Sequence, residues 1–545
     1  MTTVAPAPFV PDATSHAAAA EPPAKMTHRK ILEALSGLLL AMFVAMLSGT
    51  VVSNALPRIV GDLHGSETSY TWVVTATLLT LTASTPLWGK LSDLVNRKLL
   101  MQIAICIYIF GSLFAGLSQS TSFLIACRAV QGVGAGGILA LTQVILAAMV
   151  SPRERGRYSG YLGAVFAIAT ISGPLLGGVI VDTSWLGWRW CFYVGVPFAA
   201  AALIVLQKTL RLPTIRRDGA TVDYLGAALI ISGVSLLLIW VSLAGSQFAW
   251  GSSESAAMVA GGVLLLALAV LVELKVKEPI IPLGLFRHRT IALATIASLF
   301  VGVALYGATI FLSQYFQISR GKTPTASGLL TMPLILGLAL SSLVVGRIIT
   351  RTGNWKRFLV LGTALTAIGF GLLGTLRADT SGILVAVYMA IAGVGVGMTM
   401  QNLVLSVQNS VSIRELGSAT ATVSFFRSLG GAIGVSALGA VLASHVRTDI
   451  ASGLTRNGLP APSMEGANSL PNPATLPPVI RTIVETAYGR GTAGVFLIAT
   501  PLLVLAFVAV LFIRETPLRT SNDDSESNPS TRTDADADAD AVVAA

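Results

Sequence analysis

The sequence predicts an all-α membrane protein whose chain crosses the bilayer fourteen times. Of its 545 residues, 53% are hydrophobic and only 11% are charged, and the mean hydropathy is +0.75. A soluble domain carries about 25% charged residues. Long apolar runs recur along the chain, and basic residues collect in alternate connections between them. These observations place the chain in the membrane class.

The apolar runs define the individual spans. A spanning helix needs roughly 20 mostly apolar residues, and a helix satisfies its own backbone polar groups in lipid. By this criterion we expect spans at 34–56, 70–88, 99–117, 122–150, 158–181, 190–207, 224–245, 256–273, 290–316, 328–349, 357–376, 383–406, 418–444 and 492–513.

The basic residues predict the orientation. Lys90, Arg97 and Lys98 follow the second span, and the other even-numbered connections are similarly basic, whereas the odd ones are poorer, with Arg320 and Lys322 the exception. Cytoplasmic loops accumulate Lys and Arg. We therefore expect both termini in the cytoplasm and a bacterial cytoplasmic membrane. The net charge of +10 is explained by this rule without a nucleic-acid partner.

Three segments lie outside the spans. Residues 1–30 and 516–545 are polar, and the second ends in DADADADA, so we expect both to be disordered. The connection 445–491 contains six prolines. We expect it to be extracellular and mostly irregular, with one short amphipathic helix near Val479 to Tyr488.

An internal repeat divides the chain. The stretch GKLSDLVNRK (89–98) after the second span aligns with GRIITRTGNWK (346–356) after the tenth, so that Gly89 matches Gly346 and Asp93 falls on Thr350. The alignment predicts six spans in 31–207, an inserted pair in 208–289, and six spans in 290–515. Repeats around a central cleft are the architecture of secondary transporters.

Five motifs carry a family resemblance from about Leu35 to Pro517. They are GKLSDLVNRK, RAVQGVGAGG (128–137), GPLLGG (173–178), WRWCFYVGVP (188–197) and PIIPLGLFR (279–287). In this order the motifs resemble those of the major facilitator superfamily, and within it the fourteen-helix drug:proton antiporters. The resemblance implies a monomeric carrier in the lipid bilayer that uses the proton gradient in place of a cofactor.

Several of these motif residues are candidates for gating or proton coupling. Asp93 could bind neighbouring cations, with Arg97 and Arg157 as partners, or the N-terminus of a neighbouring helix, and so latch the inner ends of the two halves. The alternative is an ordinary solvated loop charge.

Arg128, with Gln131 one turn on, is costly inside a span. The resemblance implies proton coupling, and the alternative is that Arg128 snorkels to the outer interface. Gly173 and Pro174 interrupt the fifth span, either as plain packing or as a bendable contact between the halves.

The substrate site is predicted near the midplane. Arg427 lies about nine residues into its span, beside Phe425 and Phe426, and would suit a planar anionic or neutral ligand. The alternative is a structural hydrogen bond to backbone carbonyls. Further candidates are Ser48, Thr50, Asn54, Gln143, Tyr306, Phe311, Gln314, Gln401 and Asn402. A Tyr/Phe stripe such as that around Tyr306 is more often packing than a site.

A carboxylate is missing where the resemblance implies one. The first-span motif of the family commonly begins with aspartate, and here Ser48 precedes TVVSNALP. We find no Asp or Glu in the interior of any predicted span, although several lie at span ends or in loops, whereas Arg128 and Arg427 are embedded. An unpaired cation in a low-dielectric cleft costs several kcal/mol. We therefore expect neutral, zwitterionic or anionic amphipathic cargo, with Asp182 as the remaining titratable candidate near Arg189.

The sequence thus predicts a transporter that exports antibiotics or similar amphipathic compounds, and so confers antibiotic resistance. Export of an endogenous metabolite or lipid differs only in cargo. A sensor that kept the fold without transporting is a third hypothesis. The sequence shows no nucleophile–base pair and no metal-ligand set, so we do not expect an enzyme.

Overall fold

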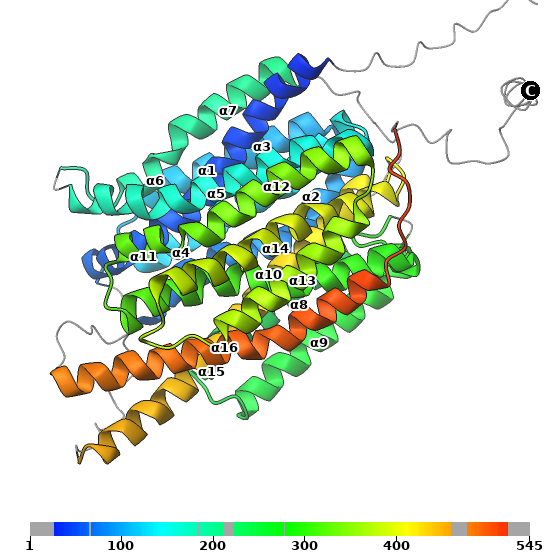
Figure 1. The fold of residues 1–545 in the computed structure, drawn as a ribbon. Coiled ribbons are helices and arrows are strands. Elements are labelled where there is room, and N and C mark those ends of the chain that lie inside the picture. The colour runs from blue at the N-terminus through cyan, green and yellow to red at the C-terminus, as the bar shows by residue number, and fades with distance from the viewer. Residues whose placement is uncertain are drawn as a thin grey trace, which may run out of the picture.

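The computed structural model describes residues 27–64, 67–183, 185–210, 223–245, 247–276, 278–458 and 477–520, which form one bundle of long helices (Figure 1). Its helices are α1 (His28–Asp62), α2 (Glu67–Leu94), α3 (Arg97–Gly116), α4 (Thr121–Met149), α5 (Pro152–Asp182), α6 (Trp190–Tyr193), α7 (Gly195–Thr209), α8 (Tyr224–Leu243), α9 (Ser253–Glu273), α10 (Arg289–Gln314), α11 (Pro324–Leu330), α12 (Met332–Thr352), α13 (Lys356–Leu373), α14 (Gly382–Asn409), α15 (Leu416–Arg456) and α16 (Pro478–Leu511), with short turns η1 (Leu283–Arg287) and η2 (Tyr315–Ser319).

Fourteen helical segments cross the bundle. Thirteen, counted within the described residues, are long and apolar enough to span a membrane, with α6–α7 and α11–α12 each forming one crossing. The remaining crossing is α2, whose threonines and serines make it more polar. Its 28 residues extend ~42 Å at ~1.5 Å per residue. The all-α prediction is confirmed, and each predicted span coincides with a crossing.

Local sequence signals explain several helix ends. The Ser120 hydroxyl accepts a hydrogen bond from the N–H of Phe123 at the start of α4, and the Asp223 carboxylate accepts one from Gly226 at the start of α8. Such caps satisfy N–H groups that have no partner inside the helix. Pro152 opens α5, where its missing N–H costs nothing. Gly353, at φ +76°, ends α12 in the left-handed conformation that glycine adopts freely.

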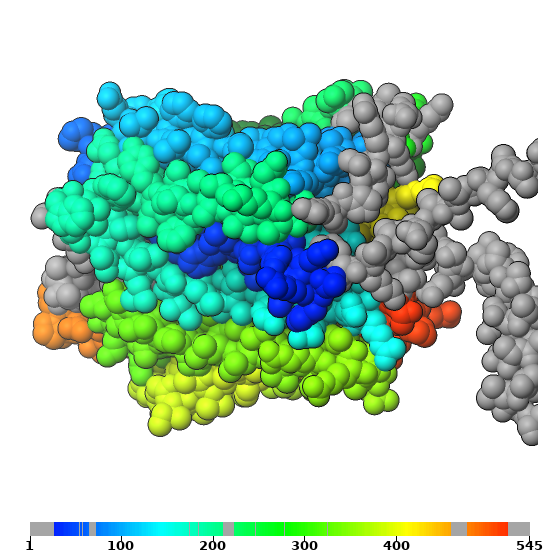
Figure 2. Space-filling model, turned by 90° about the horizontal axis from the view of Figure 1, so that it is seen from above, coloured from blue at the N-terminus to red at the C-terminus, as the bar shows by residue number. Residues whose placement is uncertain are grey.

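Two sets of six crossings pack in the same pattern. In the first set α1 packs against α5, α2 against α4, and α3 against α4; in the second α10 packs against α15, α12 against α14, and α13 against α14. A repeat of six crossings would produce this arrangement. In Figure 2 the blue-to-teal half lies alongside the green-to-yellow half, which reflects the contact of α5 with α12.

The inserted pair lies over the boundary between the halves. Helix α8 packs against its partner α9 and against both α2 and α15. One apolar cluster joins Ala83 of α2, Ile230 and Val234 of α8, and Phe425 of α15. The outer face of α9 exposes a row of apolar side chains, which suits contact with lipid tails: Val263, Leu264, Leu268, Val270 and Leu271.

The connection 445–491 differs from the sequence-based expectation, as does the beginning of the C-terminal tail. The connection 445–491 is largely helical in its described part, because α15 continues to Arg456 and α16 begins at Pro478. Leu454 and Val484 are buried there, and a Cβ at Gly453 would contact Ile483, so the two helices extend as a packed pair. Residues 459–476 lie outside the described part, as do 1–26 and 521–545 of the tails.

Residues 515–519, which we name the C-terminal strap, pack against the bundle although most of them belong to the predicted disordered tail. Leu518 is buried, and the Arg519 guanidinium donates to the carbonyls of Gln408 and Val411. The Arg519 carbonyl accepts from the N–H of Arg153. At the other end of the chain, His28 is hydrogen-bonded to Tyr158. Both described ends of the chain therefore lie at the end of the bundle where α5 begins (Figure 1).

Candidate functional site

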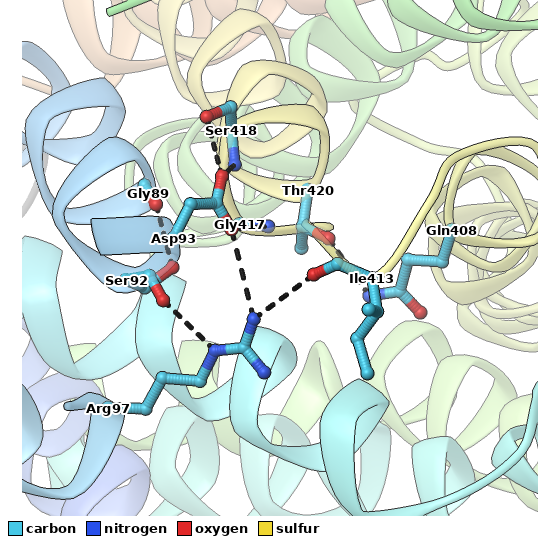
Figure 3. Close-up of polar contacts among 9 residues, drawn as sticks. All are labelled: Gly89, Ser92, Asp93, Arg97, Gln408, Ile413, Gly417, Ser418 and Thr420. Atoms are coloured by element: carbon cyan, nitrogen blue, oxygen red, sulfur yellow. Dashed lines mark hydrogen bonds and ion pairs between the residues drawn. The ribbon is translucent and has the colours of Figure 1, made fainter. Parts of the chain in front are cut away.

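Asp93 joins the two halves at the end of the bundle where α2 ends (Figure 3). Its Oδ1 accepts the N–H of Gly417 at 2.8 Å, and its Oδ2 accepts the N–H and the hydroxyl of Ser418 at 2.8 and 2.7 Å. These amides belong to the first turn of α15, whose N–H groups lack partners within the helix. A carboxylate from the N-terminal half therefore caps a helix of the C-terminal half.

Arg97 completes this contact. Its Nη2 lies 3.8 Å from Asp93 Oδ1 and donates to the Ile413 carbonyl, and its Nε donates to the Ser92 carbonyl. Asp93 is buried, and lies beyond the predicted span 70–88. Burial raises the pKa of Asp93 from 3.8 to about 6, against the opposing effects of the Ser418 and Gly417 hydrogen bonds and of Arg97. The group therefore remains ionised at neutral pH.

Gly89 permits the close approach that this contact requires. A Cβ at Gly89 would overlap the Cβ of Ala421 and lie 2.9 Å from the Gly417 carbonyl oxygen. Helices α2 and α15 therefore touch backbone to backbone one turn before Asp93. We name this region the α2–α15 seam. Close packing of this kind needs small residues on both helices.

A second seam repeats the first between α5 and α12. A Cβ at Gly346 would overlap the Gly156 carbonyl, and Gly160 and Gly163 face Leu343 and Ser342. The glycine spacing on α5 was a signal in the sequence that our motif analysis did not use. We name this region the α5–α12 seam.

The repeat alignment also holds in space at this seam. Thr350, which aligns with Asp93, accepts the backbone N–H of Arg157 at 3.0 Å. Arg157 is therefore a residue of the α5–α12 seam, with its guanidinium near His28, and the expected partnership with Asp93 is wrong.

Arg128 lies in a buried polar network. Its Nη1 donates to Gln131 Oε1 at 2.5 Å, and the Gln131 amide nitrogen donates to the hydroxyls of Ser48 and Ser112 at 3.0 and 2.7 Å. Arg128 is only 2% exposed, so the snorkelling alternative is wrong. Ser48 is thus linked to Arg128 through Gln131.

A central cavity lies between the halves. The space in it that the centre of a water molecule can occupy is ≈ 40 Å³. Four predicted substrate residues, Gln143, Tyr306, Gln401 and Arg427, line it. The other lining residues were not predicted: Met42, Met46, Leu81, Thr85, Leu139, Ala140, Leu162, Phe166, Leu305, Met400, Ser424 and Ser428. They are dispersed over several helices, and each alone resembles an ordinary span residue.

The polarity of the cavity is set by one cation and neutral groups. Gln143 Oε1 and Ser424 Oγ are buried without a hydrogen-bond partner among the described residues, so they are available to a ligand. Arg427 supplies the charge. No carboxylate occurs among the described lining residues. Asn402 borders a smaller adjoining pocket, and its amide donates to the Met398 carbonyl.

Other predicted substrate residues do not line this cavity. Phe425 and Phe426 point away from it, into the apolar cluster with α8. Phe311 packs in the core of the C-terminal half, and Gln314 likewise is not among the lining residues. Each lies on the right helix but on another face, which sequence spacing does not reveal.

Gly173 of the GPLLGG motif packs within one half, whereas Gly178 faces Thr325 of α11 in the other half. A Cβ at Gly173 would overlap Thr50 of α1, and Thr50 donates to the Leu47 and Ala169 carbonyls. Helix α5 is continuous through Gly173 and Pro174, so the expected interruption is wrong. The side chains of Asn54, Pro174 and Asp182 lie outside the described residues. Arg189, expected near Asp182, stacks on the Trp188 ring and donates to the Ser118 carbonyl.

Two matched helical halves that enclose a polar cavity define a multi-pass membrane transporter of the secondary type. The chain belongs to the Major Facilitator Superfamily, whose model matches residues 38–435. It is therefore a transporter and not an enzyme.

Known proteins similar to this chain are named as transporters. An uncharacterized MFS-type transporter of Mycobacterium tuberculosis is 36% identical over 90% of this chain and 70% of its own length. The multidrug transporter protein MdtP of Bacillus subtilis is 34% identical over 77% and 76%. The efflux pump dotC of Dothistroma septosporum is 33% identical over 90% and 85%.

Solved structures share the fold. The proton:xylose symporter XylE, bound to 6-bromo-6-deoxy-D-glucose, superposes with a TM-score of 0.60 at 14% identity, over 92% of this chain and 99% of its own. The human organic anion transporter MFSD10 gives a TM-score of 0.58 at 16% identity, over 87% and 99%.

Proposed function

We propose that this protein exports amphipathic small molecules, such as antibiotics, across the cytoplasmic membrane by alternating access and proton antiport. The observation that carries the proposal is the central cavity, which contains Arg427 and neutral polar groups but no carboxylate among its described lining residues. The relatives named as multidrug transporter and efflux pumps support export. They are consistent with membership of the fourteen-helix drug:proton antiporters.

The orientation follows from the basic connections. The end that carries Asp93 and both seams is the cytoplasmic end, and both termini lie there. The seams close this end in the conformation described. Release of the Asp93 contact would open the cavity to the cytoplasm. Each hydrogen bond to a charged group contributes about 1.5–3 kcal/mol, so the Asp93 contact is a substantial part of the inner closure.

The cargo is neutral, zwitterionic or anionic. A ligand anion could pair with the Arg427 guanidinium and accept from the cavity amides, while Met42, Met46 and Phe166 cover its apolar part. A permanent dication would meet like charge and no buried acid, at a cost of several kcal/mol.

The test uses the full chain in proteoliposomes with an imposed pH gradient. The probes are carboxyfluorescein, an anion; Nile red, a neutral dye; ethidium, a cation; and methyl viologen, a dication. We expect gradient-driven flux of the first two and little of methyl viologen. Rapid pumping of methyl viologen would contradict the cargo class, flux indifferent to the gradient would contradict antiport, and no flux of any probe would favour the sensor.

Arg427→Gln tests the cavity cation directly. Its loss should reduce carboxyfluorescein flux about tenfold, because a hydrogen bond to a charged group contributes about 1.5–3 kcal/mol, while Nile red flux changes little. The matched control is Arg447→Gln, an exposed arginine on the same helix. Equal loss for both dyes would assign Arg427 a structural role instead.

A further inference from the structure

Two buried carboxyl groups face each other at the cytoplasmic end of the inserted pair. Asp223 caps α8, and Glu273 is the last residue of α9; they are 7% and 6% exposed. A Cβ at Gly226 would overlap Asp223 Oδ2 and lie 3.1 Å from Glu273 Oε1. The two oxygens therefore flank the same point.

Three of the four carboxylate oxygens of this pair accept hydrogen bonds from described residues, and the fourth does not. Glu273 Oε1 and Oε2 accept the N–H groups of Ile280 and Ile281 at 2.9 and 3.1 Å. Asp223 Oδ1 accepts the N–H of Gly226 at 2.8 Å. Asp223 Oδ2 is buried without a partner among the described residues, and it lies next to Gly226, as Glu273 Oε1 does. Two ionised carboxylates in this arrangement would repel each other with no hydrogen bond between them.

We propose that Asp223 and Glu273 form a proton-binding site, in which one proton is held between Asp223 Oδ2 and Glu273 Oε1. The proton supplies the missing hydrogen bond and removes one of two adjacent negative charges. Like-charged carboxylates that share a buried site commonly hold a proton in this way.

Among the described residues, one basic group acts on Glu273 through its charge. From α2, Lys90 acts on Glu273 through its charge and forms an ion pair with Glu278 of the α9–α10 connection at 2.6 Å. The α15 side chains that pack at this corner are Phe425 and Phe426, which are apolar. Counted over these described groups alone, the fully ionised pair sets three carboxylates against one ammonium, and one bound proton leaves two.

The site is placed to act on the inner closure. Lys90 precedes Asp93 by one turn of α2, on the same face, and it adjoins Gly89 in the α2–α15 seam. A proton on the pair reduces the negative charge near Lys90. It thereby changes the electrostatic interactions of the last turns of α2, which include Asp93. This coupling role rests on the proposed antiport, whereas proton binding itself does not.

Infrared spectroscopy of the full chain in lipid tests proton binding without any transport assay. At about pH 7, where Asp93 is ionised, the wild-type spectrum should contain a protonated-carboxyl band that is absent from Asp223→Asn and from Glu273→Gln. Glu254→Gln, at the exposed opposite end of α9, is the control and should retain the band. Asparagine is as good a helix cap as aspartate, so Asp223→Asn should fold. Identical spectra for wild type and Asp223→Asn would overturn the proposal.

Transport by Asp223→Asn tests the coupling. The introduced side-chain amide would donate permanently to Glu273, as the bound proton does. We expect carboxyfluorescein exchange without a gradient to persist and gradient-driven accumulation to be lost. If wild-type flux itself ignores the gradient, the proposed antiport fails while the infrared result still stands. If the variant accumulates dye like wild type, the coupling role of the pair fails.

Discussion

At the residue scale, the inner closure depends on one carboxylate, that of Asp93, and on the three hydrogen-bond donors that it binds. Asp93 presents two accepting oxygens to the Gly417 and Ser418 amides and the Ser418 hydroxyl. Protonation would leave both oxygens able to accept. An amide would not, because its nitrogen can only donate. Protonation and amidation of the same side chain should therefore have opposite effects.

Asp93→Asn should open the cytoplasmic end. The asparagine nitrogen would face donors, which costs about 1–3 kcal/mol per unsatisfied group, and would shift the equilibrium about tenfold or more towards the inward-facing state. Hydrogen exchange of the backbone amides of 416–420 measures this as faster exchange. Glu415→Gln, the exposed neighbour, is the control. Unchanged exchange in Asp93→Asn would contradict a closing role for Asp93.

Acidification should favour the closed state. The pKa of Asp93 is about 6 in the closed state and near its ordinary value of 3.8 once the side chain is released into water. The closed state therefore binds the proton more tightly, and closure becomes more favourable as the pH falls from about 6 towards about 4. Above pH 7 the effect is flat. Spin-label distances between the inner ends of α2 and α15 report the shift, which Asp93→Asn should abolish. Opening of the seam on acidification would contradict the sign.

At the element scale, glycine allows helices of different halves to touch. The α2–α15 seam needs Gly89, and the α5–α12 seam needs Gly156 and Gly346, because any Cβ at these positions would meet backbone atoms of the facing helix. Backbone cannot yield as a flexible side chain can. In the proposed alternating access these contacts would form and separate in each transport cycle, so small residues here would serve motion as well as packing.

Gly89→Ala should therefore impair closure more than folding. Overpacking costs about 1–3 kcal/mol, and separation of α2 from α15 relieves it, so transport should fall about tenfold or more while the protein remains assembled. Gly439→Ala is the matched control on α15, where a Cβ would meet open space. Normal transport by Gly89→Ala would contradict the need for glycine at this close contact.

Sequence patterns located elements better than faces. The fourteen crossings were found because lipid demands long apolar runs. Asp93 was recognised as a latch candidate, but its partner Gly417 lies far along the chain in the other half, and nothing local to either segment identifies it. Phe425 and Phe426 were placed on the correct helix beside Arg427, yet they face α8, since consecutive residues on a helix point about 100° apart. Which of them meets the cavity depends on how the halves pack.

At the scale of the whole molecule, the C-terminal strap ties elements of both halves together. The Trp355 indole donates to the Thr516 carbonyl, and the Asn409 amide donates to the Pro517 carbonyl, while the Arg519 carbonyl accepts from Arg153 of the other half. The strap therefore adds a connection across the end of the bundle that carries Asp93, and this connection is independent of both seams.

A chain shortened to end at Arg514 should lose this connection. We expect a thermal midpoint lower by at least ~2 °C, because several hydrogen bonds and the burial of Leu518 are lost, together with faster hydrogen exchange at 408–413. A chain that ends at Thr520 keeps the strap and is the control. If the two shortened chains behave alike, the strap contributes nothing to closure.

The two seams are fastened unequally, because Asp93 accepts three hydrogen bonds and carries a charge whereas Thr350 accepts one from Arg157. Separation of the halves should then follow a fixed order, with α5 and α12 parting before α2 and α15. The first gap towards the cytoplasm would be wedge-shaped and one-sided. A flat molecule could pass through such a gap earlier than a globular one of equal volume. The difference between Asp93 and Thr350, which occupy the same position of the repeat, would thus make entry depend on molecular shape.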